Sequence, residues 1–278
     1  MRIGQLTEIY RPHINGVANF VSLHKHTLES MGHEVFVFVP GNDAYEDDEP
    51  NVLRAPALPI SNTGYHLQLG FPRHLQEALK TMDVLHVHHP FLVGQRAVNV
   101  AKQLGIPTVF TNHSRYHLLT AYYVPLATER FSWALMAAYL PRFTKRCDLI
   151  IVPSRGIKDH LRELGVTGPI EVVPNGIDLV RFRNPSAPRS KRDLGLPADA
   201  VIAITVGRLG PEKNLPFLLQ SFARIAGQVP GLHLVMVGRG PEEESLQELA
   251  GSLGLSARIH LIGEVPYDEV PNWLAMAD

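Results

Sequence analysis

The stretch VIAITVGRLGPEKN, residues 201–214, shows the local arrangement from which the chain is built. Its apolar run Val201–Val206 is typical of a buried strand, and a glycine follows the run at once. Apolar residues then return with helical spacing in Leu215–Ala226. A buried strand that leads through a glycine turn into a helix is the repeating unit of α/β proteins with a parallel sheet.

The same alternation continues in both directions from this stretch. It predicts strands at Ile3–Leu6, Glu34–Val39, Val84–His88, Thr108–Thr111, Leu149–Pro153, Leu232–Val237 and Ile259–Ile262. It predicts helices at Val17–Met31, Val93–Leu104, Ser154–Leu164, Glu242–Leu253 and Glu269–Ala277. Because the strands are apolar throughout, we expect parallel sheets with helices on both faces.

The alternation stops between Pro174 and Arg189, where the polar, proline-bearing stretch Arg181–Arg189 predicts a linker. We therefore expect an N-terminal Rossmann-like domain at residues 1–180 and a C-terminal Rossmann-like domain at residues 181–278. An open doubly wound domain usually has five or six strands, and the second half has three predicted ones. We expect an incomplete second sheet with exposed apolar residues, and an artificial C-terminal end.

Composition narrows the class of protein. The chain has 278 residues, 45% of them hydrophobic, and its net charge is −1, so no overall basic field indicates nucleic-acid binding. The single cysteine, Cys147, precedes an apolar strand and is expected to be buried and structural. The N-terminus has no signal-peptide run, and the apolar stretch Trp133–Leu140 is too short to span a membrane. These features predict a cytoplasmic protein, with contact to a membrane surface left open.

Glycine-bearing turns stand at four predicted strand-to-helix junctions, around Gly16, Gly207, Gly238 and Gly263. Ligands of open α/β sheets bind at the carboxyl ends of the strands, where the free N–H groups of a helix start favour phosphate. Glycine is also common where a helix simply packs against a strand, so no single turn by itself indicates a phosphate site.

The turn at Gly207 carries the strongest signal for an anion site. Arg208 follows the strand and Lys213 stands five residues later at a helix start, so two cations can converge on one diphosphate. The alternative is a solvated turn with two surface charges. No Asp-x-Asp pair is present for a metal-held diphosphate, which favours metal-independent group transfer with fixed cations at the leaving group.

Histidines mark a second candidate site. His113 follows the strand Thr108–Thr111 beside Asn112, Ser114 and Arg115, and such a polar cluster can hold a sugar or a phosphate. The alternative is an ordinary loop histidine. His86 and His88 lie on one face of a predicted strand; zinc is disfavoured there because neither cysteine nor carboxylate clusters beside them.

Aromatic and basic residues alternate between Tyr116 and Arg146. If Trp133, Arg142, Lys145 and Arg146 share an exposed face, the N-terminal domain should bind anionic membranes. A core helix with basic residues on its outer side is the other interpretation.

Several segments together resemble a known family, the retaining GT-B glycosyltransferases of family four. They are Asn15-Gly16-Val17, Gly32-His33-Glu34-Val35, Asp83–His88, Cys147–Ser154, Val173–Asp178, Gly207–Asn214 and Gly238-Arg239-Gly240-Pro241. The opening Thr7–Val17 and the region Asn112–Tyr116 look most like members that glycosylate diacylglycerol or phosphatidylinositol.

The resemblance implies a transferase that moves a hexose from a UDP-glucose- or GDP-mannose-type donor to an acceptor, most simply a membrane lipid, with no cofactor beyond this co-substrate. It implies that Gly16, Arg208 and Lys213 bind the donor diphosphate and that His113 lies at the transferred sugar. Gly238, Gly240, Glu264 and Val265 would line the nucleoside pocket.

The family's Glu-x7-Glu signature would lie beyond residue 278, so we expect this fragment to be weakly active or inactive. A nucleotide-sugar 2-epimerase and a non-catalytic nucleotide-sugar-binding protein remain alternatives, and the sequence indicates no protein partner.

Overall fold

The computed structural model describes residues 1–13, 15–41, 45–59, 66–68, 72–124 and 126–278. The chain divides into two compact units, Met1–Ile177 and Asp178–Asp278. No helix among the described residues is long and apolar enough to cross a membrane.

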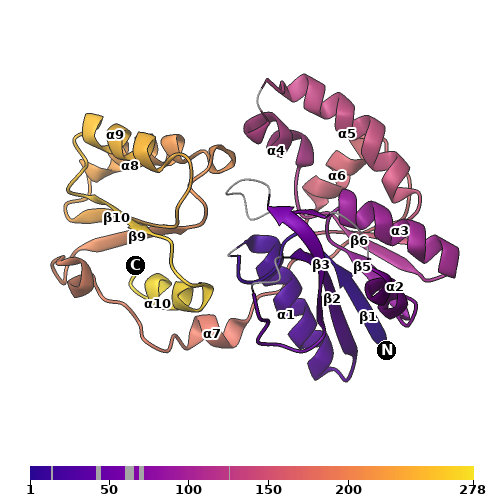
Figure 1. Cartoon of the computed structure of the whole chain (residues 1–278). Helices are drawn as coiled ribbons and strands as arrows, with labels where there is room; N and C mark the ends of the chain where they lie inside the picture. The colour runs from indigo at the N-terminus through magenta and orange to yellow at the C-terminus, as the bar shows by residue number, and fades with distance from the viewer. Residues whose placement is uncertain (14, 42–44, 60–65, 69–71, 125) are drawn as a thin grey trace. The chain divides into compact units, whose positions relative to one another are not determined.

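The first unit is built on an eight-stranded sheet with helices on both faces (Figure 1). Its strand order is β4-β3-β2-β1-β5-β6-β7-β8, and all neighbouring strands are parallel except β3 and β4. The strands are β1 (Arg2–Leu6), β2 (Glu34–Gly41), β3 (Val52–Pro59), β4 (His66–Gln68), β5 (Val84–Val87), β6 (Thr108–Thr111), β7 (Leu149–Val152) and β8 (Ile170–Val172). The helices are α1 (Gly16–Ser30), α2 (Arg73–Leu79), α3 (Leu92–Leu104), α4 (Tyr116–Tyr123), α5 (Glu129–Thr144) and α6 (Arg155–Glu163).

Strand alternation sends side chains of this sheet into two different layers. Phe36 and Phe38 on β2 join the large core that is formed with α2, α3, α5 and α6. Val37 and Val39 on the same strand join a much smaller apolar cluster beneath α1. The face beneath α1 is therefore only partly apolar, and its remainder carries the polar side chains described below.

The second unit holds a three-stranded parallel sheet in the order β11-β10-β9, and its strands are β9 (Val201–Val206), β10 (Leu232–Val237) and β11 (Ile259–Gly263). The helices α8 (Leu215–Ala226) and α9 (Glu243–Ser252) pack on one face, and α10 (Val270–Leu274) packs on the other (Figure 1). The three strands predicted for this half are confirmed. Several apolar side chains of this unit are exposed: Val201, Val206, Phe217 and Ile225.

The predicted α/β class is confirmed, whereas some elements gave no clear signal in the sequence. β3 contains Arg54 and Pro56 and is held by parallel pairing with β2, so tertiary context creates the strand. The predicted linker is also wrong in part. Residues Leu179–Arg183 form the helix α7, and the following chain is bonded to α10 through Asn272, whose side chain accepts from the N–H of Ala187 at 2.9 Å.

Cys147 is buried in the first core, as predicted. Burial raises the pKa of its thiol to about 12, so the group stays protonated and unreactive at neutral pH.

Candidate functional site

The glycine turns of the second unit lie side by side at the carboxyl edge of its sheet. The Gly207 N–H donates to the carbonyl of Val237 at 2.9 Å, and the Gly238 N–H donates to the carbonyl of Gly263 at 2.8 Å. The three turns that the sequence placed after β9, β10 and β11 therefore form one continuous edge. This is the position at which ligands of open parallel sheets bind.

A cavity of about 350 Å³ opens between β9 and the start of α8, and both Arg208 and Lys213 line it. The aliphatic part of Lys213 runs back toward Gly207, since a Cβ atom built on Gly207 would lie 3.9 Å from Lys213 Cε. Both cationic side chains are exposed. The structure thus brings the two predicted cations to one cavity at a helix start, an arrangement that suits a diphosphate.

Gly238 and Gly240 do not line this cavity in the second unit, which the structure describes throughout. A Cβ atom on Gly238 would lie 1.9 Å from the carbonyl oxygen of Gly207, and one on Gly240 would lie 2.2 Å from that of Leu209. The Leu209 N–H donates to the carbonyl of Arg239 at 2.9 Å. These glycines are needed so that the Arg208 loop can pack against the β10 turn; their contact with a nucleoside stays a prediction.

The other predicted donor residues lie at the ends of their strands or helices. Glu264 is exposed and Val265 is half-buried, directly after Gly263, which has a positive φ of 86°. Gly16 is the first residue of α1, where the Asn15 side chain accepts from the Val17 N–H at 2.8 Å. A Cβ atom on Gly16 would meet no described atom within 4 Å, so the turn is open around it.

The first unit concentrates polar side chains on the sheet face beneath α1. Gln5 on β1 pairs in register with His86 on β5, and alternation along the chain places His88 on the same face. Thr111 on the neighbouring strand β6 contributes a hydroxyl, and α1 contributes His24 from above. Strand order brings these residues together although Gln5 and His88 are 83 positions apart.

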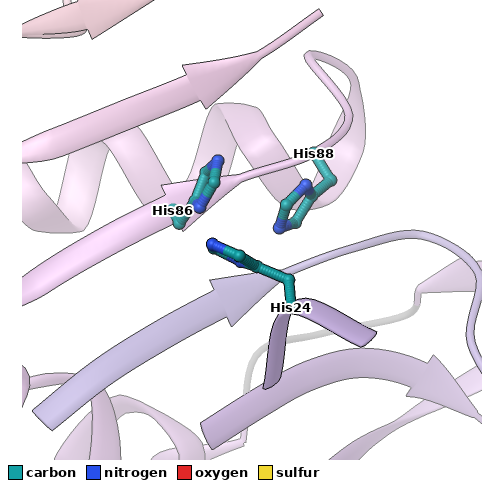
Figure 2. Close-up of side chains that lie close together, drawn as sticks. All are labelled: His24, His86 and His88. Carbon is teal, nitrogen blue, oxygen red and sulfur yellow. The ribbon is translucent and has the colours of Figure 1, made fainter. Parts of the chain in front are cut away.

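Short contacts connect these side chains into one cluster, which we call the histidine cluster: Gln5, His24, His86, His88, Thr111 and His113. Gln5 Oε1 lies 3.2 Å from His24 Nδ1 and 3.1 Å from His88 Nε2. His88 Nδ1 lies 3.1 Å from His113 Nε2, and His86 Nε2 lies 2.7 Å from Thr111 Oγ1. Figure 2 shows the rings of His24, His86 and His88 turned toward one another.

Burial keeps the histidines of this cluster neutral. Desolvation, with a smaller contribution from neighbouring histidines, lowers the pKa of His86 to about 3 and that of His113 to about 4. The pKa values of His24 and His88 are lowered by the same main cause. The adjacent His89 has its pKa lowered to about 3 by burial, so the whole group carries no charge at neutral pH.

Neutral imidazoles are also the form that binds metals, and one triad could hold an ion. The ring nitrogens of His24, His86 and His88 lie within 4.8 Å of one another, and among the described residues they are the one group of this kind. From the sequence alone, a zinc site could be considered only at His86 and His88, because His24 comes from a different element.

Glu8 is a residue for which the sequence gave no signal. It follows β1, and its carboxylate accepts from the Val93 N–H at the start of α3, at 3.4 Å. Burial raises its pKa to about 7 despite the backbone hydrogen bonds that Val93 and Leu92 donate to it. A carboxyl group that titrates near neutrality at the functional edge of a sheet is a candidate for proton transfer, and capping of α3 explains its position equally well.

The aromatic stretch differs from the predicted membrane face. Trp133 is half-buried, and its ring packs 5.1 Å from His117 and 5.2 Å from His160, measured between ring centroids. Arg146 is half-buried too and donates to Asn99 Oδ1 at 2.9 Å. The condition for a shared exposed face is therefore not met by these two residues, which fit the core-helix interpretation, while Arg142 and Lys145 are exposed.

Comparison with known proteins defines the class to which this fold and these sites belong. The sequence profile of Glycosyltransferase Family 4 matches residues 14–181, and that of Glycosyl transferases group 1 matches residues 186–278. In structure, the chain is similar to Anabaena HepE solved with UDP and glucose, with a TM-score of 0.70 at 16% identity, covering 100% of this chain and 72% of that one. The fold is that of a GT-B glycosyltransferase.

Two curated relatives are similar over most of this chain. An alpha-monoglucosyldiacylglycerol synthase of Acholeplasma laidlawii is 34% identical, over 100% of this chain and 73% of that protein. A GDP-mannose-dependent alpha-mannosyltransferase of Corynebacterium glutamicum is 29% identical, over 90% of this chain and 60% of that protein. The chain belongs to the family 4, group 1 glycosyltransferases, and it spans between 60% and 73% of the length of these two relatives.

Proposed function

We propose that the protein is a retaining, metal-independent glycosyltransferase that moves a hexose from a nucleotide-sugar to a membrane lipid. The observation that supports this most is the cavity that Arg208 and Lys213 share at the carboxyl edge of the second sheet. A nucleoside diphosphate leaves with increased negative charge, and two fixed cations stabilise it most in the transition state. The reaction then requires neither a cofactor nor a divalent ion.

The donor in this proposal is of the UDP-glucose or GDP-mannose type, because one similar relative is named for a glucosyl product and another is named as GDP-mannose-dependent. His113, at the carboxyl end of β6, lies at the transferred sugar. Gly16 contacts the diphosphate, and Gly238, Gly240, Glu264 and Val265 surround the nucleoside. The lipid acceptor is proposed because the name of one similar relative specifies a glucosyldiacylglycerol product.

The decisive test is an acceptor-dependent transfer assay with radiolabelled UDP-glucose and GDP-mannose, in micelles that contain diacylglycerol or phosphatidylinositol. It should be run with EDTA, on the 278-residue chain and on any longer protein that the gene encodes. We expect a labelled α-glycolipid from one donor. Release of nucleotide without an acceptor, an epimerised sugar, or binding without turnover by the longer protein would contradict the proposal and identify one of the alternatives.

A membrane surface for this acceptor can be proposed near α4 and α5, with residues other than Trp133 and Arg146. We define a lipid-facing patch by its exposed apolar side chains, which are Tyr122, Val124, Leu126, Phe131 and Leu135. Phe131, Leu135 and the exposed Arg142 stand at i, i+4 and i+11, on one stripe of α5. Apolar and basic residues on one helix face are typical of interfacial binding to anionic lipid.

We expect the protein to sediment with anionic vesicles at low salt and to be released at high salt. The double variant Leu126→Ser/Phe131→Ser should weaken the partition coefficient at least about tenfold, because two exposed apolar side chains no longer enter the interface. Ile225→Ser, an exposed apolar position of the second unit, serves as the matched control. Equal partition of the double variant and the control would contradict this surface.

A further inference from the structure

A chain of hydrogen-bonding side chains leads from the interior of the first unit to His113. It starts at Gln5, which is fully buried on the central strand β1. Gln5 Oε1 lies 3.1 Å from His88 Nε2, and His88 Nδ1 lies 3.1 Å from His113 Nε2. Each link uses one particular nitrogen of a ring, so the position of every proton in the chain can be worked out.

The first proton is fixed by the amide of Gln5. A carboxamide oxygen only accepts hydrogen bonds, so with the Gln5 amide in this orientation, which leaves its buried Nε2 without a partner, His88 Nε2 and His24 Nδ1 both face Oε1 and carry protons. A neutral imidazole carries one ring proton, which leaves His88 Nδ1 with a lone pair. The partner of that lone pair, His113 Nε2, must therefore be the donor.

We propose that Gln5 and His88 are positioning residues that fix the tautomer of His113, placing its ring proton on Nε2 and leaving Nδ1 as a hydrogen-bond acceptor for a substrate hydroxyl group. This inference rests on the proposed function only in taking that hydroxyl to belong to the sugar or to the lipid acceptor. A ring held in this state accepts a hydrogen bond from a hydroxyl and offers no N–H to a carbonyl or phosphate oxygen at Nδ1. We call the chain Gln5–His88–His113 the relay. It favours a substrate group that donates a hydrogen bond, such as a hydroxyl, at His113 Nδ1.

The surroundings make the relay rigid. Gln5 lies between two paired strands, because β1 is bonded to β2 on one side and to β5 on the other. The ring of Phe20 on α1 packs against both His88 and His113, with centroids 5.8 Å and 5.0 Å away. A reversed amide at Gln5 would reverse both tautomers together, so the amide, His88 and His113 behave as one unit.

A metal ion at His24, His86 and His88 is the competing use of the same nitrogens. An ion bound at His88 Nε2 would displace the proton that faces Gln5, and the remaining ring proton would move to Nδ1. His113 Nε2 would then become the acceptor and its Nδ1 would carry the proton. The two arrangements therefore predict opposite tautomers of His113.

Nitrogen-15 NMR of the histidine rings distinguishes them, because protonated and lone-pair ring nitrogens resonate far apart. The His113 signals are assigned by their loss in His113→Gln. In the metal-free wild-type protein at pH 7.5 we expect a protonated Nε2 and a lone pair on Nδ1. A protonated Nδ1 on His113 would overturn the proposal. So would stoichiometric zinc in the purified protein, or added Zn²⁺ that binds tightly and moves the His24, His86 and His88 signals together.

Two variants test the relay itself. Gln5→Met removes the acceptor at similar length, and we expect the His113 nitrogens to shift toward values averaged between two tautomers. Thr111→Val removes the hydroxyl beside His86 without touching the relay and should leave the His113 tautomer unchanged. An unchanged tautomer in Gln5→Met would overturn the proposal; should that variant not fold, the same measurement is made on His88→Phe, and the wild-type spectrum remains decisive.

Turnover provides a second measurement, which would not change if Gln5 had a purely structural role. In active protein, Gln5→Met should lower kcat/KM roughly five- to tenfold, the effect of one weakened hydrogen bond, with unchanged affinity for free UDP or GDP. If the protein proves not to transfer sugar, the proposed function fails while the tautomer measurement still decides the relay. If transfer occurs and His113 shows a protonated Nδ1, the relay alone fails.

Discussion

Acidification below pH 6.5 should destabilise the first unit steeply. His86 and His89, with pKa values lowered to about 3, and His113, lowered to about 4, remain neutral in the folded state. In the unfolded chain each titrates near 6.5, so the unfolded state binds more protons between pH 6.5 and about 4. Stability is therefore present above pH 6.5 and is lost as the pH falls toward the folded pKa values. Three such groups cost up to about 4 kcal/mol per pH unit.

A loss of this size exceeds the stability of many domains within two pH units, so we expect unfolding near pH 5. The measurement is urea denaturation at a series of pH values, followed by tryptophan fluorescence. The chain has two tryptophans, one in each unit, and Trp273→Phe leaves Trp133 to report on the first unit alone.

Variants of single histidines identify the groups responsible. In the Trp273→Phe background, His86→Asn should reduce the pH slope by about 1.4 kcal/mol per pH unit, the contribution of one proton. His74→Gln changes an exposed histidine of α2 and is the matched control. A slope in His86→Asn equal to that of the control would show that carboxylates, and not the histidine cluster, control acid unfolding.

Loss of both cavity cations should abolish most donor binding. Each of Arg208→Ala and Lys213→Ala should weaken the binding of UDP- or GDP-sugar by about 1.5–3 kcal/mol, since a charged hydrogen bond to the diphosphate is lost. Because both side chains lie in one cavity, the double variant should lose on the order of 3–5 kcal/mol, with some coupling between the sites. Titration calorimetry with the free nucleoside diphosphate measures the same interaction without turnover.

The control for net charge is Arg224→Ala, at the far end of α8 from the cavity. It removes one positive charge and should leave the affinity unchanged. All three positions are exposed, so melting temperatures should stay the same. An undiminished affinity of the double variant would move the diphosphate site away from the β9 turn.

The order of strands and helices could be predicted from the sequence because it depends on local periodicity. β6, β9, β10 and α8 have the predicted ends, and others differ by a few residues at their termini. The elements without a prediction, such as β3 and β8, have mixed side chains. They become strands because the edges of β2 and β7 offer backbone partners, which no local pattern encodes.

The cavity of the second unit was predictable for a related reason. Arg208 and Lys213 are five residues apart on one strand–turn–helix junction, so local geometry alone brings them close. The packing role of Gly238 and Gly240 was not predictable, because it depends on where the backbone of a neighbouring loop passes.

By itself, the sequence determined the α/β class, the family and the positions of the candidate sites, because each of these depends on short local motifs. Only the tertiary structure decided that Gln5, His24, His88 and His113 form one neutral cluster. These residues come from β1, α1 and the ends of β5 and β6, and the sheet order β1-β5-β6 makes them neighbours. Burial beneath α1 then removes the water that would otherwise stabilise a charged imidazolium, and so keeps these imidazoles neutral.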